Sequence, residues 1–168
     1  MSKYYAGIGS RKTPKDMQPL MQEIAEMLRE KGYTLRSGHA DGADLYFESG
    51  SGDDNEIYIP WKGFNGSKSV YYGITREAYI MAEKYHPAWS KLSEAAKNLM
   101  ARNCFQVLGV DLKTPVEFVV CWTPDGGISG GTGQALRIAK DYGIPVFNLQ
   151  KTGAYTDLEI HVNRVRLI

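Results

Sequence analysis

The chain contains 168 residues, of which 43% are hydrophobic and 23% charged, and 20 Lys and Arg residues against 19 Asp and Glu residues give a formal net charge of +1. This length and apolar content predict one domain spanning residues 1–168. The balanced charge disfavours nucleic acid as a partner without excluding it, because proteins that grip long nucleic acids carry a basic excess. No apolar run of about 18 residues occurs, so we expect a cytoplasmic protein with no membrane partner.

In the first half of the chain, short apolar runs alternate with stretches of helical periodicity. Apolar residues at a helical spacing from Met17 to Leu28 predict a helix that Thr13 caps and Gly32 ends. Apolar runs that stop at glycine or proline are typical of strands. This half therefore predicts strands at 4–8, 33–38 and 56–60, joined by that helix and by a short helix at 42–48.

The second half continues the alternation after an irregular segment, 61–73, which has no steady period. The apolar run EFVVCW is typical of a strand that is covered on both faces. The tail from Asp157 to Ile168 alternates apolar and polar residues, and we expect an edge strand or a hairpin there. The other elements expected in this half are helices at 75–85, 90–108 and about 133–142, and strands at 117–122 and 144–149.

Strands that alternate with helices in this way predict an α/β fold, a three-layer Rossmann-like sandwich with a mostly parallel central sheet. Three loops, GSRKTP, SGHADGAD and PDGGISGGTGQ, each follow a predicted strand and open a helix, so they should share one edge of the sheet. A helix start offers unpaired N–H groups, and glycine lets an anion approach them closely. We therefore expect a small anionic ligand at this edge.

Neither of the two common phosphate-binding fingerprints is complete. Lys12 stands where the GxGxxG pattern needs its third glycine, and SGGTGQ lacks the Gly-Lys-Ser/Thr of a P-loop. Four stretches together resemble instead the SLOG superfamily, the Rossmann-like group that contains the DNA-processing protein DprA and the LOG proteins, and they are most similar to phage DprA-like proteins. These stretches are GIGSRKTP, SGHADGAD, EIYIPWKGFN and GGTGQALRIAKDYGIPVFNL.

That resemblance implies that the three loops bind a nucleotide or a nucleotide-derived molecule, in order to sense, sequester or process it. Arg11 adds a planar fork of donors that suits a phosphate. Arg102 and Asn103 interrupt an otherwise apolar helix with polar groups that need partners, so both are also expected to bind the ligand. The residues that the resemblance assigns to the ligand are Gly9, Ser10, Arg11, Ser37, Gly38, Ala40, Gly42, Asp44, Gly130, Gly131, Thr132 and Gly133.

Whether a reaction takes place is left open by the sequence. LOG enzymes resemble one another in a motif whose final glutamate helps to cleave the bond between base and ribose phosphate, and Arg137 occupies that place here. One alternative is an N-glycosidic hydrolase or transferase that acts on a nucleotide, with Glu48 or Asp44 as the catalytic carboxylate. A second alternative is a DprA-like protein that binds single-stranded DNA.

Several side chains have two readings. Trp61 and Phe64 either stack a base or pack the irregular segment onto the core. Asn103 and Gln106, one helical turn apart, either read the edge of a base or tie the helix to a loop. Asp44 either contacts the ligand or caps the helix that follows it.

The expected partners are a small nucleotide-like ligand and, from the family resemblance, a second copy of the chain in contact with residues 61–73. The residues require no cofactor, and the histidines and cysteines do not have the spacing of a metal site. Mg²⁺ that accompanies a phosphate ligand is the one metal alternative. Its candidate ligands are Asp41, Asp44, Asp53 and Asp54.

Overall fold

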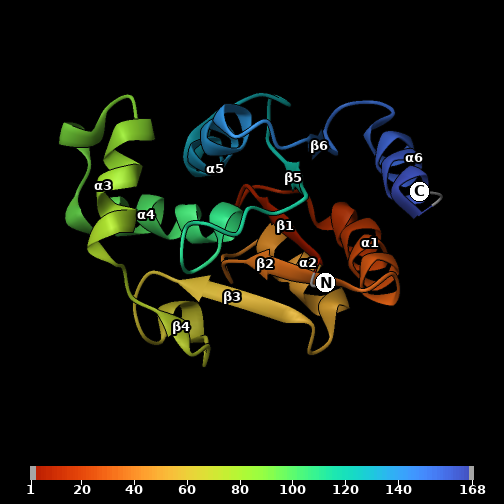
Figure 1. The fold of residues 1–168 in the computed structure, drawn as a ribbon, viewed down its shortest axis with the longest axis horizontal. Helices are drawn as coiled ribbons and strands as arrows, with labels where there is room; N and C mark the ends of the chain where they lie inside the picture. Colours follow the sequence, from red (N-terminus) through yellow and green to blue (C-terminus); the bar gives the residue numbers. More distant parts are fainter. Residues whose placement is uncertain (1–2, 167–168) are drawn as a thin grey trace.

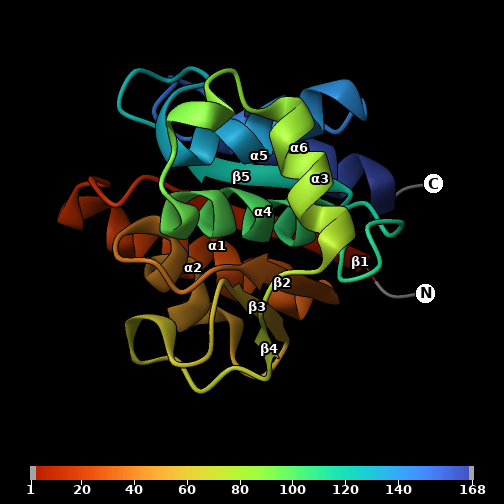
Figure 2. The ribbon, with the colours of Figure 1, turned by 90° about the vertical axis from the view of Figure 1, so that its left-hand side faces the viewer.

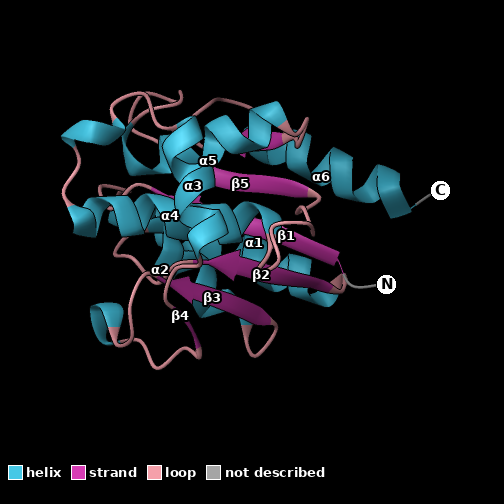
Figure 3. Ribbon diagram, turned by 60° about the vertical axis from the view of Figure 1, so that its left-hand side comes forward, coloured by secondary structure: helices cyan, strands magenta, loops and turns pink. Residues whose placement is uncertain are grey.

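The computed structural model describes residues 3–166 and contains a six-stranded sheet with the strand order β4-β3-β2-β1-β5-β6 (Figure 1). Every neighbouring pair of strands is parallel. Figure 3 shows β2 and β3 side by side and running in the same direction. The strands are β1 (Lys3–Gly9), β2 (Tyr33–Ser37), β3 (Asn55–Ile59), β4 (Tyr71–Tyr72), β5 (Phe118–Trp122) and β6 (Val146–Asn148).

Helices cover both faces of this sheet, which confirms the expected three-layer, Rossmann-like α/β sandwich. Figure 2 looks onto α3 and α4, which lie in front of the sheet in that view. None of the helices within residues 3–166 has the length and apolar content needed to cross a bilayer. One face carries α1 (Gln18–Glu30), α2 (Ala43–Ser51) and α6 (Ala154–Arg166), and the other carries α3 (Arg76–Tyr85), α4 (Glu94–Leu108) and α5 (Gly130–Asp141).

The interior strand β5, which lies between β1 and β6, is apolar throughout because both of its faces are covered. Phe118 and Val120 belong to the core on the side of α1, α2 and α6, whereas Val119 and Cys121 belong to the core on the side of α4 and α5. All four side chains are fully buried. Successive residues of a strand point to opposite faces, so β5 joins the three layers, as its continuous apolar run predicts.

The order of the strands places a switch point beside β1. After β1 the chain builds β2, β3 and β4 outward on one side, and it then returns to place β5 on the other side of β1. The loops that leave β1 and β5 therefore lead to helices on opposite faces, α1 and α5. In open parallel sheets, ligands bind in the crevice that forms where the strand order reverses in this way.

The expectation of an edge strand or hairpin in the tail is wrong, because this segment forms α6. Leu158 and Val162 lie in the core, whereas Ile160 between them is 49% exposed. An alternating pattern also contains a spacing of four residues, which a helix uses to bury one face. Leu167 and Ile168, at the end of the predicted strand, lie outside the described residues.

Three helix starts and one strand also differ from expectation. The helix α4 begins at Glu94 rather than at residue 90, after a 3-10 turn at Trp89–Lys91. Thr13 does not cap α1: its hydroxyl donates to the carbonyl oxygen of Ser10, and a 3-10 turn at Lys15–Met17 precedes the helix. The helix α5 begins at Gly130 rather than near residue 133, so the glycines form its first turn. The irregular segment contains a 3-10 turn at Phe64–Gly66 and the short edge strand β4.

Candidate functional site

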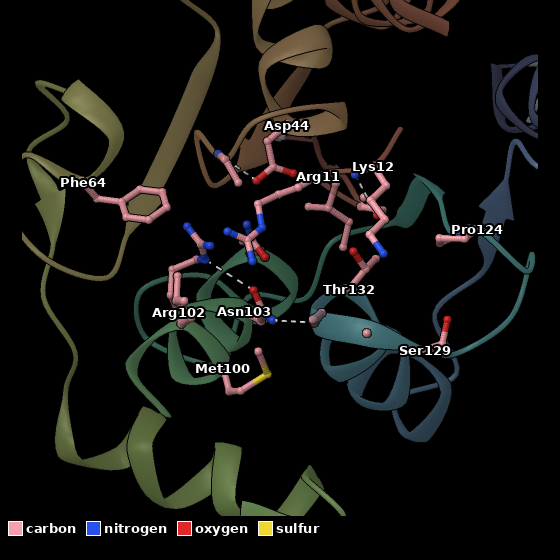
Figure 4. A pocket seen from close by; sticks show the side chains of 18 residues that line it. Arg11, Lys12, Asp44, Phe64, Met100, Arg102, Asn103, Pro124, Ser129 and Thr132 are labelled. Atoms are coloured by element: carbon pink, nitrogen blue, oxygen red, sulfur yellow. Dashed lines mark hydrogen bonds between the residues drawn. The ribbon is translucent and has the colours of Figure 1, made fainter. Parts of the chain in front are cut away.

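A pocket of about 340 Å³ lies at the switch point, where β1 and β5 end. Its wall comes from the loop after β1, the loop after β2 with the start of α2, the turn at Phe64, α4 and the start of α5 (Figure 4). Small-molecule sites have volumes of roughly 300–1,000 Å³. The three loops that the sequence assigns to one edge of the sheet therefore meet around a space of suitable size.

Two glycines allow the first two loops to pack backbone against backbone. A Cβ at Gly9 would lie 2.6 Å from the Cβ of Ala43 and 2.8 Å from the carbonyl oxygen of Trp122. Gly42 has a φ of +86°, and a Cβ there would lie 2.6 Å from the carbonyl oxygen of Ser10. Any side chain would clash at these distances, and the positive φ disfavours other residues as well. The loop after β1 is thus held against α2 and β5, which fixes its position at the pocket.

The first turn of α5 lies at the pocket, and no side chain within residues 3–166 caps its backbone N–H groups. Ser129 occupies the N-cap position, but its hydroxyl donates to Oδ1 of Asp125 at 2.9 Å and caps no backbone group. By contrast, a threonine and a serine hydroxyl accept from the first turns of α3 and α4. The first-turn residues Gly130, Gly131 and Thr132 line the pocket. Their N–H groups and the positive end of the helix dipole favour an anion at this end.

Arg102 holds the opposite end of the pocket together. Its Nη1 donates to the carbonyl oxygens of Gly38 and Tyr58, at 2.7 and 3.0 Å, and so joins the ends of β2 and β3 to α4. Its Nε donates to Oδ1 of Asn103 at 3.3 Å. The guanidinium carbon lies 5.4 Å from the centre of the Phe64 ring. Figure 4 shows Phe64 and Arg102 on the far side of the pocket from Ser129 and Pro124.

Asp44 is the acidic side chain of the pocket wall, and it is 4% exposed. Its Oδ2 accepts a hydrogen bond from the backbone N–H of Ala40 at 3.3 Å. Burial raises the pKa of Asp44 to about 6, although the positive charge of Arg102 lowers it in part. No ion pair joins Asp44 to Arg102 within the described residues. The carboxyl group of Asp44 therefore gains or loses its proton near pH 6, close to the physiological range.

The charges of the pocket wall are mostly positive. Arg11 and Lys12 are exposed at its rim, and Arg102 is buried inside it. Burial lowers the pKa of the Arg102 guanidinium, and the nearby Asp44 opposes that change. Arginine side chains keep their charge in proteins near neutral pH. Three cations thus face one carboxyl group, and the uncapped start of α5 adds further positive potential. This arrangement favours an anionic guest.

Most of the expected ligand-binding residues lie together at this pocket. Ser37 and Gly38 do not line it: Ser37 donates to the carbonyl oxygen of Gly7 at 2.6 Å, and Gly38 accepts from Arg102. Gly42 and Gly133 do not line it either, since the first allows loop packing and the second lies inside α5. Those that do are Gly9, Ser10, Arg11, Ala40, Asp44, Arg102, Asn103, Gly130, Gly131 and Thr132.

The two expected catalytic carboxylates have different surroundings. Asp44 lines the pocket, whereas Glu48 lies one turn further along α2 and outside the pocket wall. Oε1 of Glu48 lies 2.9 Å from Nδ1 of His39, so this carboxylate is engaged in an ion pair or a hydrogen bond with the histidine. A catalytic role for either residue stays a prediction.

Three of the four acids proposed for Mg²⁺ lie in separate contacts, and the fourth, Asp53, is exposed and outside the pocket wall. Asp54 pairs with Arg29 at 3.2 Å, and Asp41 accepts from the side-chain amide of Asn65 at 3.0 Å, while Asp44 faces the pocket. Within residues 3–166, no three His, Cys, Asp or Glu side chains gather as they would around a bound metal ion. A magnesium ion held partly by a phosphate ligand stays a prediction, with Asp44 as its one candidate residue in the pocket wall.

Some residues of the pocket wall are absent from the expected set. Lys12 stands beside Arg11 and lines the pocket, whereas in the sequence it is evident only as the residue that breaks the GxGxxG pattern. Leu99 and Met100 fit an apolar helix face and give no signal of their own. Phe64 and Gln106 have a signal with two readings, and the structure brings both to the pocket.

The fold and the pocket define a Rossmann-like α/β protein with a pocket at its switch point whose wall is mostly positively charged. No protein-family model matches the sequence, and a comparison with curated proteins finds no match. Among solved structures, the chain is similar to DNA processing protein A from Helicobacter pylori, with a TM-score of 0.61 and 16% identity over 95% of this chain and 73% of that one. At this identity the likeness shows a DprA-like fold.

This neighbour corrects the expectation about nucleic acid. The work on the Helicobacter pylori protein describes its single-stranded DNA binding mode. The expectation that nucleic acid is an unlikely partner is therefore wrong. It rests on the balanced charge of the whole chain. The pocket itself gathers cations that the net charge of +1 hides.

Proposed function

We propose that this chain binds a nucleotide unit in the pocket at the switch point, with the phosphate at the start of α5. The observation that carries the proposal is the uncapped first turn of α5 facing a pocket whose wall holds three cations and one carboxyl group. Free helix-start amides and arginine side chains are the groups that proteins use for phosphates. Sequence features point to the same ligand class, since three loops of this kind resemble those of the SLOG superfamily.

The shape of the pocket suits the remainder of a nucleotide. Beyond the start of α5 the wall becomes apolar, with Met100 and Leu99 from α4, and it ends at Phe64 and Arg102. A flat base can lie against such side chains while the phosphate stays at the cationic end. The guest is therefore a molecule with an anionic end and a planar end.

Single-stranded nucleic acid is the second candidate source of this nucleotide unit. The neighbour of the same fold supports it, and so does an aromatic surface next to the pocket. Trp61 and Tyr72 are 41% and 51% exposed, and Nζ of Lys62 lies 6.0 Å from the centre of the Tyr72 ring. Trp61 contacts Phe64 of the pocket wall edge to face, at 5.5 Å between ring centres. Exposed aromatic rings beside lysines are typical of surfaces that stack bases and neutralise phosphates.

Isothermal titration with thymidine 5′-monophosphate and with a thymidine oligonucleotide tests the proposal and separates its two sources. Binding of both with similar affinity assigns a free nucleotide as the ligand. Binding of the oligonucleotide alone, with an affinity that falls steeply as salt rises, assigns a strand. Binding of neither ligand would contradict the proposal.

Arg11 gives the matched variant for this experiment. A charge-assisted hydrogen bond contributes about 1.5–3 kcal/mol, so Arg11→Ala should weaken binding by on the order of ten- to a hundredfold. Arg29→Ala is the control, because Arg29 pairs with Asp54 at an exposed place away from the pocket wall. Equal affinities of the two variants would remove Arg11 from the site.

A further inference from the structure

The end of the pocket formed by Arg102, Gln106 and Phe64 contains hydrogen-bonding groups with no partner. Gln106 is 2% exposed and lines the pocket, yet no hydrogen bond joins its side-chain amide to any described residue. Arg102 is 5% exposed and uses Nε and Nη1, whereas its Nη2 has no partner among residues 3–166. Leaving buried donors unpaired costs free energy, so these groups need an acceptor.

These free groups open onto the pocket. Within the described residues, the hydroxyl of Tyr5 is the one side-chain group that is both sealed from solvent and without a partner. The amide of Gln106 and Nη2 of Arg102 are therefore not sealed, and the space that they reach is the pocket that both residues line. A guest in this pocket can satisfy them.

The side chains of Gln106 and Arg102 both pack against the backbone of Gly38. A Cβ at Gly38 would lie 2.4 Å from Nε2 of Gln106 and 2.5 Å from Nη1 of Arg102, so the amide and the guanidinium lie side by side. Phe64 packs near that guanidinium, and Met100 contributes an apolar side chain to the same wall. Phe64 and Met100 thus line the pocket together with Arg102 and Gln106.

We propose that this end of the pocket selects a nucleobase that carries an exocyclic carbonyl oxygen and discriminates against adenine. The inference rests on the proposed function. A carbonyl oxygen is an acceptor that Nη2 of Arg102 and Nε2 of Gln106 can share. The amino group of adenine can pair with Oε1 of Gln106 but leaves Nη2 of Arg102 without an acceptor, because a guanidinium only donates. Buried polar groups that are built for one partner reject an analogue that leaves them unpaired.

Inosine and adenosine 5′-monophosphates are the matched probes, because their bases differ at the purine 6-position, where one has a carbonyl oxygen and the other an amino group. Titration calorimetry of the full chain should give an affinity for the inosine compound that is on the order of ten- to a hundredfold higher. Equal affinities, or tighter binding of the adenosine compound, would overturn the inference while the proposed function stands. Binding of neither nucleotide would also overturn the inference, and the thymidine titrations then decide separately whether the proposed function stands.

Two variants of Gln106 assign the preference to this residue. Gln106→Met keeps the length of the side chain and removes the amide, so the ratio of the two affinities should fall toward one while both nucleotides still bind. Gln106→Glu replaces the donor with an acceptor beside Arg102 and should abolish the preference in the same way. Thermal unfolding checks that each variant is folded. A ratio that stays at the wild-type value in either folded variant would remove Gln106 from base selection.

Discussion

Nδ2 of Asn103 donates a hydrogen bond of 3.0 Å to the carbonyl oxygen of Gly131, and this contact ties α4 to the first turn of α5. Oδ1 of the same amide accepts from Arg102, so both ends of the Asn103 side chain are engaged. Asn103 is therefore a positioning residue: it sets where the free N–H groups of α5 lie relative to the base end of the pocket.

Asn103→Ala should lower both the stability and the affinity for a nucleotide. Loss of a buried hydrogen bond that leaves its partners unpaired costs about 1–3 kcal/mol, which denaturant unfolding can measure. The affinity for thymidine 5′-monophosphate should fall as well, because the start of α5 is no longer held in place. Asn163→Ala is the control: Asn163 is exposed, and such substitutions change stability by about 0.5 kcal/mol or less. Unchanged affinity in Asn103→Ala would show that α4 does not position the site.

Asp44→Asn should stabilise the protein above pH 6. The pKa of Asp44 is raised from 3.8 to about 6 by burial, so the folded state holds this proton in a range where the unfolded state has lost it. Stability is therefore lost as the pH rises from about 4 to 6, and a neutral amide avoids that loss. About two pKa units correspond to roughly 3 kcal/mol at neutral pH. Urea unfolding across this range measures the difference, and a difference that does not vary with pH would contradict the assignment.

Gly131→Ala should have opposite effects on stability and on binding. A Cβ at Gly131 would make an ordinary contact of 3.6 Å with Cε of Met100, so the substitution fits the folded chain. Alanine is favoured over glycine in a helix by about 0.5–1 kcal/mol, and the melting temperature should rise. The added methyl group stands in the pocket wall beside the free N–H groups, so a phosphate should bind more weakly. A variant that is stabilised and binds as the wild type would show that the ligand does not approach Gly131.

The layers of this fold could be predicted from local patterns, because a strand that is buried on both faces has a continuously apolar sequence. FVVCW, the sequence of β5, is continuously apolar because this strand is covered on both sides. The three loops share an edge because parallel strands end at the same edge of a sheet. The tail could not be predicted in this way. Leu158 and Val162 fit a strand face and a helix face equally well, and the choice depends on the sheet surface that α6 covers.

Some residues of the pocket wall could be predicted from local sequence patterns, whereas others are placed there by packing between distant parts of the chain. Gly9, Gly130, Gly131 and Arg11 belong to loops with a local signature, so their place in the pocket wall could be predicted. The role of Gln106 is ambiguous in the sequence. Its place beside Gly38 and Arg102 depends on the packing of α4 against the end of β2, which the sequence does not show. Phe64 comes from a segment without periodicity, and its place in the wall depends on packing between distant parts of the chain.

The most direct test of the central claim is an NMR titration, in which the backbone amide signals of ¹⁵N-labelled protein are followed as thymidine 5′-monophosphate is added. The claim predicts large, saturable shifts of the amide signals of Gly130, Gly131 and Thr132, whose N–H groups lie at the uncapped start of α5. The amides in the first turn of α3, which Thr75 caps, serve as the internal control and should stay in place. Saturable binding that leaves the three α5 amides unmoved would contradict the account.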